Sequence, residues 1–158
     1  MWRDLELGAP EITRVGLSRL DSTRVAYLGT LRPDGSPRIS PIATYLVAGH
    51  LLVGAMSWSR KADDLRRDPR YVLHSAILDP DAGEPELKIY GEAMVAGSDL
   101  REAAAGAWWS GRPAGDAAVF SLSIRQAVLI EWDVEGGQMV THRWSPRRGC
   151  ARSVRTYP

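Results

Sequence analysis

Residues Arg32 to Pro37 (RPDGSP) constrain the fold of this chain more than any other short stretch. An Asp-Gly pair between two prolines is typical of a tight reverse turn. Strand-forming residues stand on both sides of it, from Arg24 to Leu31 and from Arg38 to Val47. The sequence therefore predicts an antiparallel hairpin. Pro41, inside the second strand, predicts a bulge or an unpaired backbone stretch there.

Further strand-like segments continue this pattern along the chain. Strands are predicted at residues 51–56, 71–78, 86–96, 121–133 and 138–144. The run at 71–78 is almost wholly apolar, which indicates burial on both faces. Short helices are predicted at residues 11–20, 61–67 and 99–109, the last capped by Ser98. Because closing a sheet removes its exposed edges, we expect a mainly β protein, a β-barrel with short helices at its corners.

Length and composition are those of one domain without a basic or acidic bias. The 158 residues are 44% hydrophobic, and 20 Lys and Arg stand against 19 Asp and Glu, which does not favour nucleic acid or a membrane surface as partner. The acidic N-terminus does not resemble a secretory signal, and no apolar run approaches a membrane span, so we expect a cytoplasmic protein. The single cysteine, Cys150, and the scattered histidines predict neither a disulfide nor a metal site.

Residues Ser57 to Leu65 (SWSRKADDL) join a predicted strand to a predicted helix. Ser57 or Ser59 can cap this helix, which places Arg60 and Lys61 in its first turn. Cations are disfavoured there by about 0.3–1 kcal/mol each, because a helix start is already positive. A phosphate held by the serine hydroxyls, the free N–H groups and the two cations would resolve the conflict.

A local alternative stays open for the same residues. Asp63 and Asp64 stand in the same helix and can neutralise Arg60 and Lys61 as exposed ion pairs. The helix start alone does not decide between a bound phosphate and these ion pairs, because short motifs often occur without their function.

Several segments match a known family in order and spacing. They are the hairpin TLRPDGSPRISPI, the strand LLVGAM, the junction SRKADDLRRDPR, the strand LKIYGEA and a last strand ending in RWSP. Together they span most of residues 24–146, and they resemble the flavin-binding split-barrel family that includes pyridoxamine 5'-phosphate oxidase and the flavin- and deazaflavin-dependent reductases of actinobacteria. The resemblance implies an antiparallel split β-barrel over residues 1–146, and a homodimer with FMN at each subunit interface. Residues 147–158 are then a basic C-terminal tail.

The resemblance also implies where the cofactor binds. The phosphate-binding cations fall on Arg60 and Lys61, with Ser59 beside them and Arg38 reaching over from the neighbouring strand. The flavin ring is expected to lie, largely through backbone groups, against Ile39, Ser40, Pro41, Ala55 and Met56.

Three more residues of the expected site lie later in the chain. Glu86 falls where the oxidase has a glutamine facing the ring, and Lys88 lies on the same strand face. An ionised Glu86 cannot donate a hydrogen bond to a ring carbonyl, so the pattern departs from the oxidase here. Trp144 matches an aromatic that the partner subunit lays near the ring.

Each of these residues also has a purely structural interpretation. Arg38 can be a solvated strand charge, and Ala55 and Met56 can be core. Trp108 and Trp109 are expected to be interface or core aromatics.

The implied function is a flavin-dependent oxidoreductase that transfers hydride to or from an unknown small molecule. The cofactor carries this chemistry, and we assign no catalytic side chain. One alternative is a reductase that uses the deazaflavin coenzyme, whose long anionic tail suits the arginines from Arg143 onward. The other is a flavin- or small-ligand-binding protein without turnover, since a fold does not establish an activity.

Overall fold

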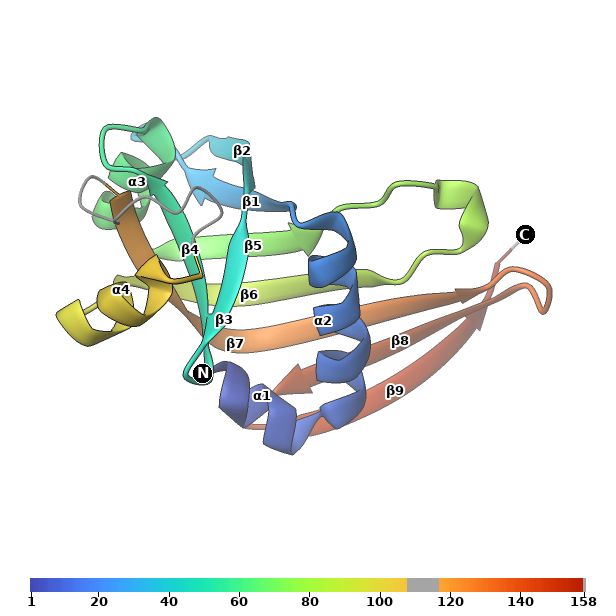
Figure 1. The fold of residues 1–158 in the computed structure, drawn as a ribbon. Helices are drawn as coiled ribbons and strands as arrows, with labels where there is room; N and C mark the ends of the chain where they lie inside the picture. Colours follow the sequence, from blue (N-terminus) through green and yellow to red (C-terminus); the bar gives the residue numbers. More distant parts are fainter. Residues whose placement is uncertain (108–116, 158) are drawn as a thin grey trace.

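The structure is a computed structural model, and it describes residues 1–107 and 117–157 (Figure 1). Its helices are α1 (Trp2–Gly8), α2 (Pro10–Thr23), α3 (Arg60–Arg67) and α4 (Ser98–Ala105), with a 3-10 turn at Pro80–Ala82. Its strands are β1 (Ala26–Leu31), β2 (Pro37–Ile42), β3 (Thr44–Val47), β4 (His50–Met56), β5 (Arg70–Ser75), β6 (Glu86–Val95), β7 (Ala117–Asp133), β8 (Gln138–Ser145) and β9 (Gly149–Thr156).

The strands form one antiparallel sheet in the order β2-β1-β5-β6-β7-β4-β3, with β8 and β9 continuing from β7. Strand β7 has 17 residues, so its first part pairs with β4, its last part pairs with β8, and both parts pair with β6. Strands β2 and β4, far apart in this order, contact each other, so the sheet curls back on itself. The fold is an antiparallel split β-barrel, as the sequence predicts.

The first hairpin confirms the turn predicted at Arg32 to Pro37. Strands β1 and β2 pair from Ala26 opposite Ile42 to Leu31 opposite Pro37, without a register shift. The bulge or unpaired backbone stretch predicted at Pro41 is therefore wrong, and the single strand predicted from Arg38 to Val47 is instead two strands, β2 and β3. A proline fits this ladder because β2 is the end strand of the sheet and one of its edges needs no N–H donor.

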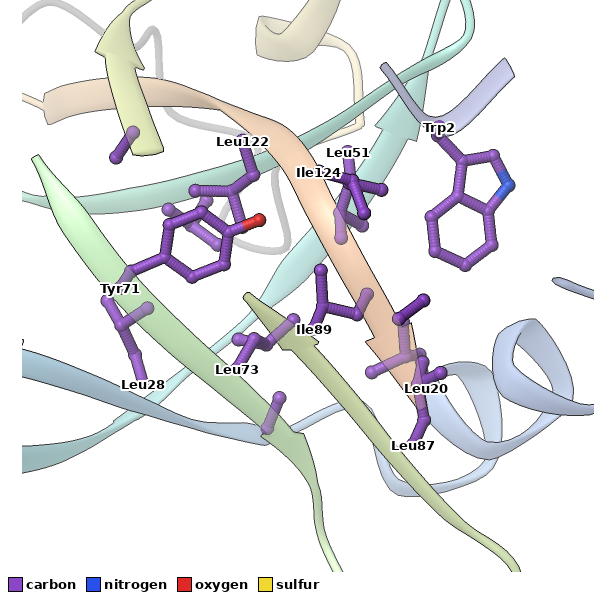
Figure 2. Packing of buried hydrophobic residues seen from close by; sticks show 14 of the residues in the cluster. Trp2, Leu20, Leu28, Leu51, Tyr71, Leu73, Leu87, Ile89, Leu122 and Ile124 are labelled. Carbon is purple, nitrogen blue, oxygen red and sulfur yellow. The ribbon is translucent and has the colours of Figure 1, made fainter. Parts of the chain in front are cut away.

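The main core fills the inside of the barrel (Figure 2). Leu87 and Ile89 of β6 point inward and are fully buried, while Lys88 between them faces outward. Helix α1, which the sequence analysis did not predict, contributes Trp2 and Leu5, neither of them exposed at all. Burying one large apolar side chain contributes about 1.5–3 kcal/mol, so this short helix is held by tertiary packing.

Two further predictions are corrected by the described residues. Strand β5, expected to be buried on both faces, alternates buried and more exposed residues because only its inner face meets the core. Helix α4 begins at Ser98 with Gly97 as its cap residue, and it packs Ala104 near Leu52 and Val119 in a smaller apolar cluster. The predictions for Trp108 and Trp109 lie outside the described residues.

Residues 147–158, treated above as a basic tail, contain strand β9. It pairs with β8 along its whole length, and all of its residues are exposed. Because neither face is covered, no apolar alternation marks this strand in the sequence. No helix in the described part of the chain is long and apolar enough to cross a membrane. The cytoplasmic location and the boundary at residue 146 stay predictions.

Candidate functional site

Helix α3 begins just after β4, and the connecting residues form a corner of the fold (Figure 1). Ser59 occupies the N-cap position with an extended backbone, φ −77° and ψ 145°. Its Oγ makes no capping hydrogen bond, and it is buried without a partner in the described structure. Leaving a buried hydroxyl unpaired costs about 1–3 kcal/mol. A ligand group at this position would satisfy it.

Arg60 and Lys61 follow in the first turn of α3, and the ion-pair alternative for them is wrong. Asp63 pairs with Arg66, at 3.1 Å between Oδ1 and Nη1. Asp64 is buried beneath the helix and pairs with other arginines. Arg60 is exposed and has no ion pair or hydrogen bond from its side chain within residues 1–107 and 117–157. Its charge is therefore available to a ligand.

Lys61 links α3 to the end strand β2. Its Nζ donates to the Pro41 carbonyl oxygen at 2.9 Å. Partial burial lowers the pKa of Lys61 below its usual value. An ammonium group has further N–H donors, so this bond does not exhaust what Lys61 can bind.

Asp64 fixes the position of Arg38. Asp64 Oδ2 accepts hydrogen bonds from Arg38 Nε at 2.6 Å and from the buried Thr30 hydroxyl at 3.0 Å. Burial tends to raise the pKa of Asp64, but the hydrogen bonds from Arg38 and Thr30 outweigh it and hold the pKa below its usual value. Arg38 is thus a positioned, partly buried cation, not a freely solvated strand charge.

The residues predicted to contact the ring lie on β2 and at the end of β4, the strand that leads into α3. Ser40 points into the core, whereas Ile39 and Pro41 face outward from β2. At the end of β4, Ala55 is buried and Met56 is 57% exposed, so only Ala55 fits the core interpretation. The Met56 carbonyl accepts the Ser59 N–H at 2.9 Å, which ties β4 to the helix start. Hydrogen bonds to α3 or its cap residue thus bring Arg38, Pro41, Met56, Ser59 and Lys61 together with Arg60 at this corner, whereas Ile39, Ser40 and Ala55 are only their neighbours along β2 and β4.

Glu86 and Lys88 lie elsewhere, on the outer face of β6. The strand register places Pro41, Tyr27, His74 and Lys88 in one row across β2, β1, β5 and β6. Strand spacings of about 4.8 Å make this row about 14 Å long. Lys88 Nζ lies 2.8 Å from Glu86 Oε2, so the two form an ion pair at the far end of the row.

Trp144 is not brought to the corner either. It is 5% exposed and belongs to the main core. A Cβ added to Gly8 of α1 would lie 2.4 Å from Trp144 Nε1, so the ring packs directly on that helix.

Three residues support the corner: Asp64, which the sequence pattern assigned to Arg60 and Lys61, and Thr30 and Arg67, which no sequence pattern indicated. Arg67 Nη1 lies 3.4 Å from Asp64 Oδ1. The available signal was the position of Asp64 beside Leu65, on the side of α3 that the structure buries. A carboxylate on a buried helix face needs a partner, but the sequence does not say which one.

No family model matches this sequence, and neither does any curated protein. Solved structures do match. A pyridoxamine 5'-phosphate oxidase-related, FMN binding protein of Nostoc punctiforme aligns with a TM-score of 0.65 at 16% identity, over 95% of this chain and 96% of that one. PhzG of Burkholderia lata, in complex with tetrahydrophenazine-1-carboxylic acid, aligns at 0.63 and 14% identity, over 98% and 92%. A heme binding protein of Mycobacterium smegmatis aligns at 0.55 and 15% identity, over 89% and 86%.

These alignments define the class of fold. The chain has the split-barrel fold of the pyridoxamine 5'-phosphate oxidase-like FMN-binding proteins. At these sequence identities the alignments show the fold alone, and they do not show which ligand this chain binds.

Proposed function

We propose that this protein binds FMN at the α3 corner and works as an oxidoreductase that transfers hydride to or from a small molecule. The observation that carries the proposal is the buried Oγ of Ser59 beside Arg60, both without a side-chain partner among the described residues. An anion here would accept hydrogen bonds from Ser59, from the free N–H groups of α3 and from Arg60 and Lys61. The FMN-binding neighbour in the same fold supports a flavin phosphate as this anion.

The residues around the corner fit such a cofactor. Arg38, held by Asp64, adds a third cation beside the phosphate position. The outward faces of Ile39 and Tyr27 offer an apolar surface next to it. Bound FMN would supply hydride chemistry at its ring, and the protein would bind and orient it.

The deazaflavin coenzyme is the alternative cofactor. Its long anionic tail would need cations beyond the corner, and the sequence offers the arginines after Arg143. In one protomer Arg152 and Arg155 lie on β9, the end of a branch that leaves the strand order at β7 through β8, whereas β2 is the end strand on the other side of β1 and β5. This separation supports FMN, whose single phosphate needs only the corner.

A binding protein without turnover is the second candidate function. The observation that favours it is the heme binding protein of Mycobacterium smegmatis, which has a related structure and a different ligand. The fold therefore accommodates more than one kind of ligand and does not by itself imply turnover.

Parallel titrations with FMN, deazaflavin coenzyme and heme, followed by absorption and fluorescence, test the proposal. We expect FMN to bind most tightly, and the bound flavin to be reduced by a nicotinamide nucleotide. Binding of deazaflavin or heme in preference to FMN would overturn the cofactor assignment. Tight FMN binding without reduction by NADH or NADPH would favour the binding protein.

We also propose that the protein is a homodimer that buries the outer face of β2, β1, β5 and β6. Ile39, Tyr27 and Tyr90 are exposed on this face by 74%, 45% and 38%. The strand register places them on one face. Ile39 of β2 is opposite Gly29 of β1, Gly29 is opposite Val72 of β5, and Val72 is opposite Tyr90 of β6. An exposed group of apolar side chains on an uncovered sheet is typical of an interface.

The change Ile39→Glu is expected to weaken this dimer at least about tenfold, because it buries a charge at an apolar contact. Light scattering after gel filtration measures the mass, which should be that of two 17.4 kDa chains for the unaltered protein. Leu7→Glu is the matched control, since Leu7 is 81% exposed on α1 and outside the face. A monomeric mass of the unaltered protein at micromolar concentration would contradict the proposal.

A further inference from the structure

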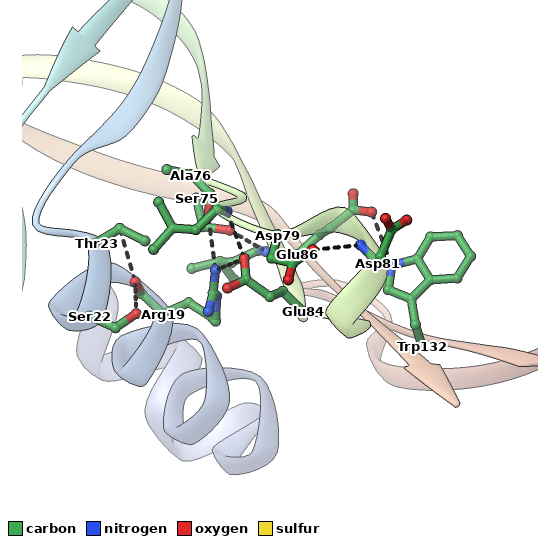
Figure 3. Close-up of polar contacts among 12 residues, drawn as sticks. Arg19, Ser22, Thr23, Ser75, Ala76, Asp79, Asp81, Glu84, Glu86 and Trp132 are labelled. Atoms are coloured by element: carbon green, nitrogen blue, oxygen red, sulfur yellow. Dashed lines mark hydrogen bonds and ion pairs between the residues drawn. The ribbon is translucent and has the colours of Figure 1, made fainter. Parts of the chain in front are cut away.

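A second site opens at the end of the β5–β6 hairpin, away from the α3 corner. It is a pocket of about 840 Å³ between the loop after β5, the last residues of β7 and the residue after β9. This volume lies within the range of about 300–1,000 Å³ that small-molecule sites occupy. Figure 3 shows the side chains of this region, with Asp81 and Glu84 on the loop, Glu86 at the start of β6 and Trp132 on β7.

One wall of the pocket is aromatic and fixed in place. The rings of Trp132 and Tyr157 meet edge to face, with centroids 5.3 Å apart and planes at 87°. Trp132 Nε1 donates to Glu86 Oε1 at 3.1 Å, which holds the indole against β6. The loop packs closely on the same wall, since a Cβ added to Gly83 would lie 2.7 Å from Val134 Cγ2. The aromatic surface is therefore part of the rigid sheet end.

The charged groups that line the pocket are all carboxylates. Asp81 has no side-chain partner in the described structure. Glu84 Oε2 accepts from Arg19 Nη2 at 2.6 Å and from the Leu78 N–H at 2.8 Å, and the Asp79 N–H also acts on this carboxylate. A carboxylate has about four acceptor positions, so Glu84 can still accept from a ligand. The hydrogen bond from Leu78 lowers the pKa of Glu84, which keeps this carboxylate ionised at neutral pH.

The cations that balance two of these carboxylates do not line the pocket. Arg19 binds Glu84 from α2, and Lys88 binds Glu86 from farther along β6. A metal ion does not fit the arrangement, because no three His, Cys, Asp or Glu side chains in residues 1–107 and 117–157 are placed to share one. The combination of open carboxylate oxygens and an aromatic wall is the chemistry that recognises an organic cation.

We propose that this pocket binds a small protonated amine on an aromatic or aliphatic body. The ammonium group donates to the Asp81 carboxylate and to a remaining acceptor position of the Glu84 carboxylate, and the apolar body contacts Trp132 and Tyr157. This site goes beyond the proposed flavin function and does not depend on it.

The test follows the indole N–H signal of Trp132 in ¹⁵N-labelled protein, assigned with the variant Trp132→Phe. The probes are 2-phenylethylamine, 3-phenylpropionate and 2-phenylethanol, which share a phenyl body and differ in charge. We expect a saturable shift with the amine, a weaker response to the alcohol and no saturable response to the carboxylate. The probes contain no phosphate or flavin, so failure here leaves the α3 corner untouched.

Two variants separate recognition of the charge from nonspecific binding. Asp81→Asn is expected to weaken amine binding about fivefold, because it removes one partly exposed charge without disturbing another contact. Glu6→Gln, an exposed acid on α1, serves as the control and should leave the affinity unchanged. The proposal is overturned if the amine produces no saturable shift, if the carboxylate binds as well as the amine, or if Asp81→Asn and Glu6→Gln behave alike.

Discussion

Replacing Arg60 and Lys61 together by alanine is expected to weaken FMN binding by about 3 kcal/mol or more, which is roughly a hundredfold or greater loss of affinity. Both side chains stand in the first turn of α3, where the free N–H groups already favour an anion. Arg60 has no acid partner in the described structure, so its charge is not offset inside the protein. Isothermal titration with FMN measures the change.

The fold should survive this double change. Lys61 contributes one hydrogen bond to Pro41, and Arg60 is exposed, so thermal unfolding should shift little. The matched control is Arg147→Ala with Arg148→Ala, which removes the same charge from an exposed turn. A folded Arg60/Lys61 variant that binds FMN as tightly as the unaltered protein would remove the corner as the phosphate site.

Gly91→Ala is expected to destabilise the fold by about 3 kcal/mol or more. A Cβ at this position would lie 1.8 Å from the Ser123 carbonyl oxygen and 3.3 Å from Tyr71 Cε1. The register of β6 and β7 shifts between Tyr90 and Gly91, and the Tyr71 hydroxyl donates to the same Ser123 oxygen at 2.9 Å. The added Cβ would clash with a backbone atom of β7 in the middle of the sheet. Moving β6 and β7 apart to remove the clash would break hydrogen bonds between the two strands.

Chemical denaturation of the Gly91→Ala variant measures this loss. Gly106→Ala is the control, because Gly106 has a helical φ of −70° and nothing within 4 Å of an added Cβ. Its effect should be neutral or slightly stabilising, since alanine restricts the unfolded chain. Equal midpoints for the two variants would contradict the tight contact at Gly91.

Local sequence patterns were sufficient to predict most of the strands and turns. The turn at Arg32 to Pro37 depends on backbone preferences of neighbouring residues, and the structure has it where the sequence predicts it. The alternation of Leu87 and Ile89 with outward residues likewise marks β6 directly. Sequence patterns did not predict α1, because this helix depends on the packing of Trp2 and Leu5 into the core and not on local helix preference.

The candidate site also has a part that the sequence predicts and a part that it does not. By itself, the sequence determined the strand-to-helix junction, because Ser59 and the first turn of α3 lie within a few consecutive residues. Only the tertiary structure decided which acid meets which cation, because Asp64 reaches Arg38 across 26 residues of chain. It likewise separated Glu86 and Lys88 from the corner and placed Trp144 in the core. Contacts between residues distant in the chain depend on how the barrel closes, and no local preference of a residue encodes that closure.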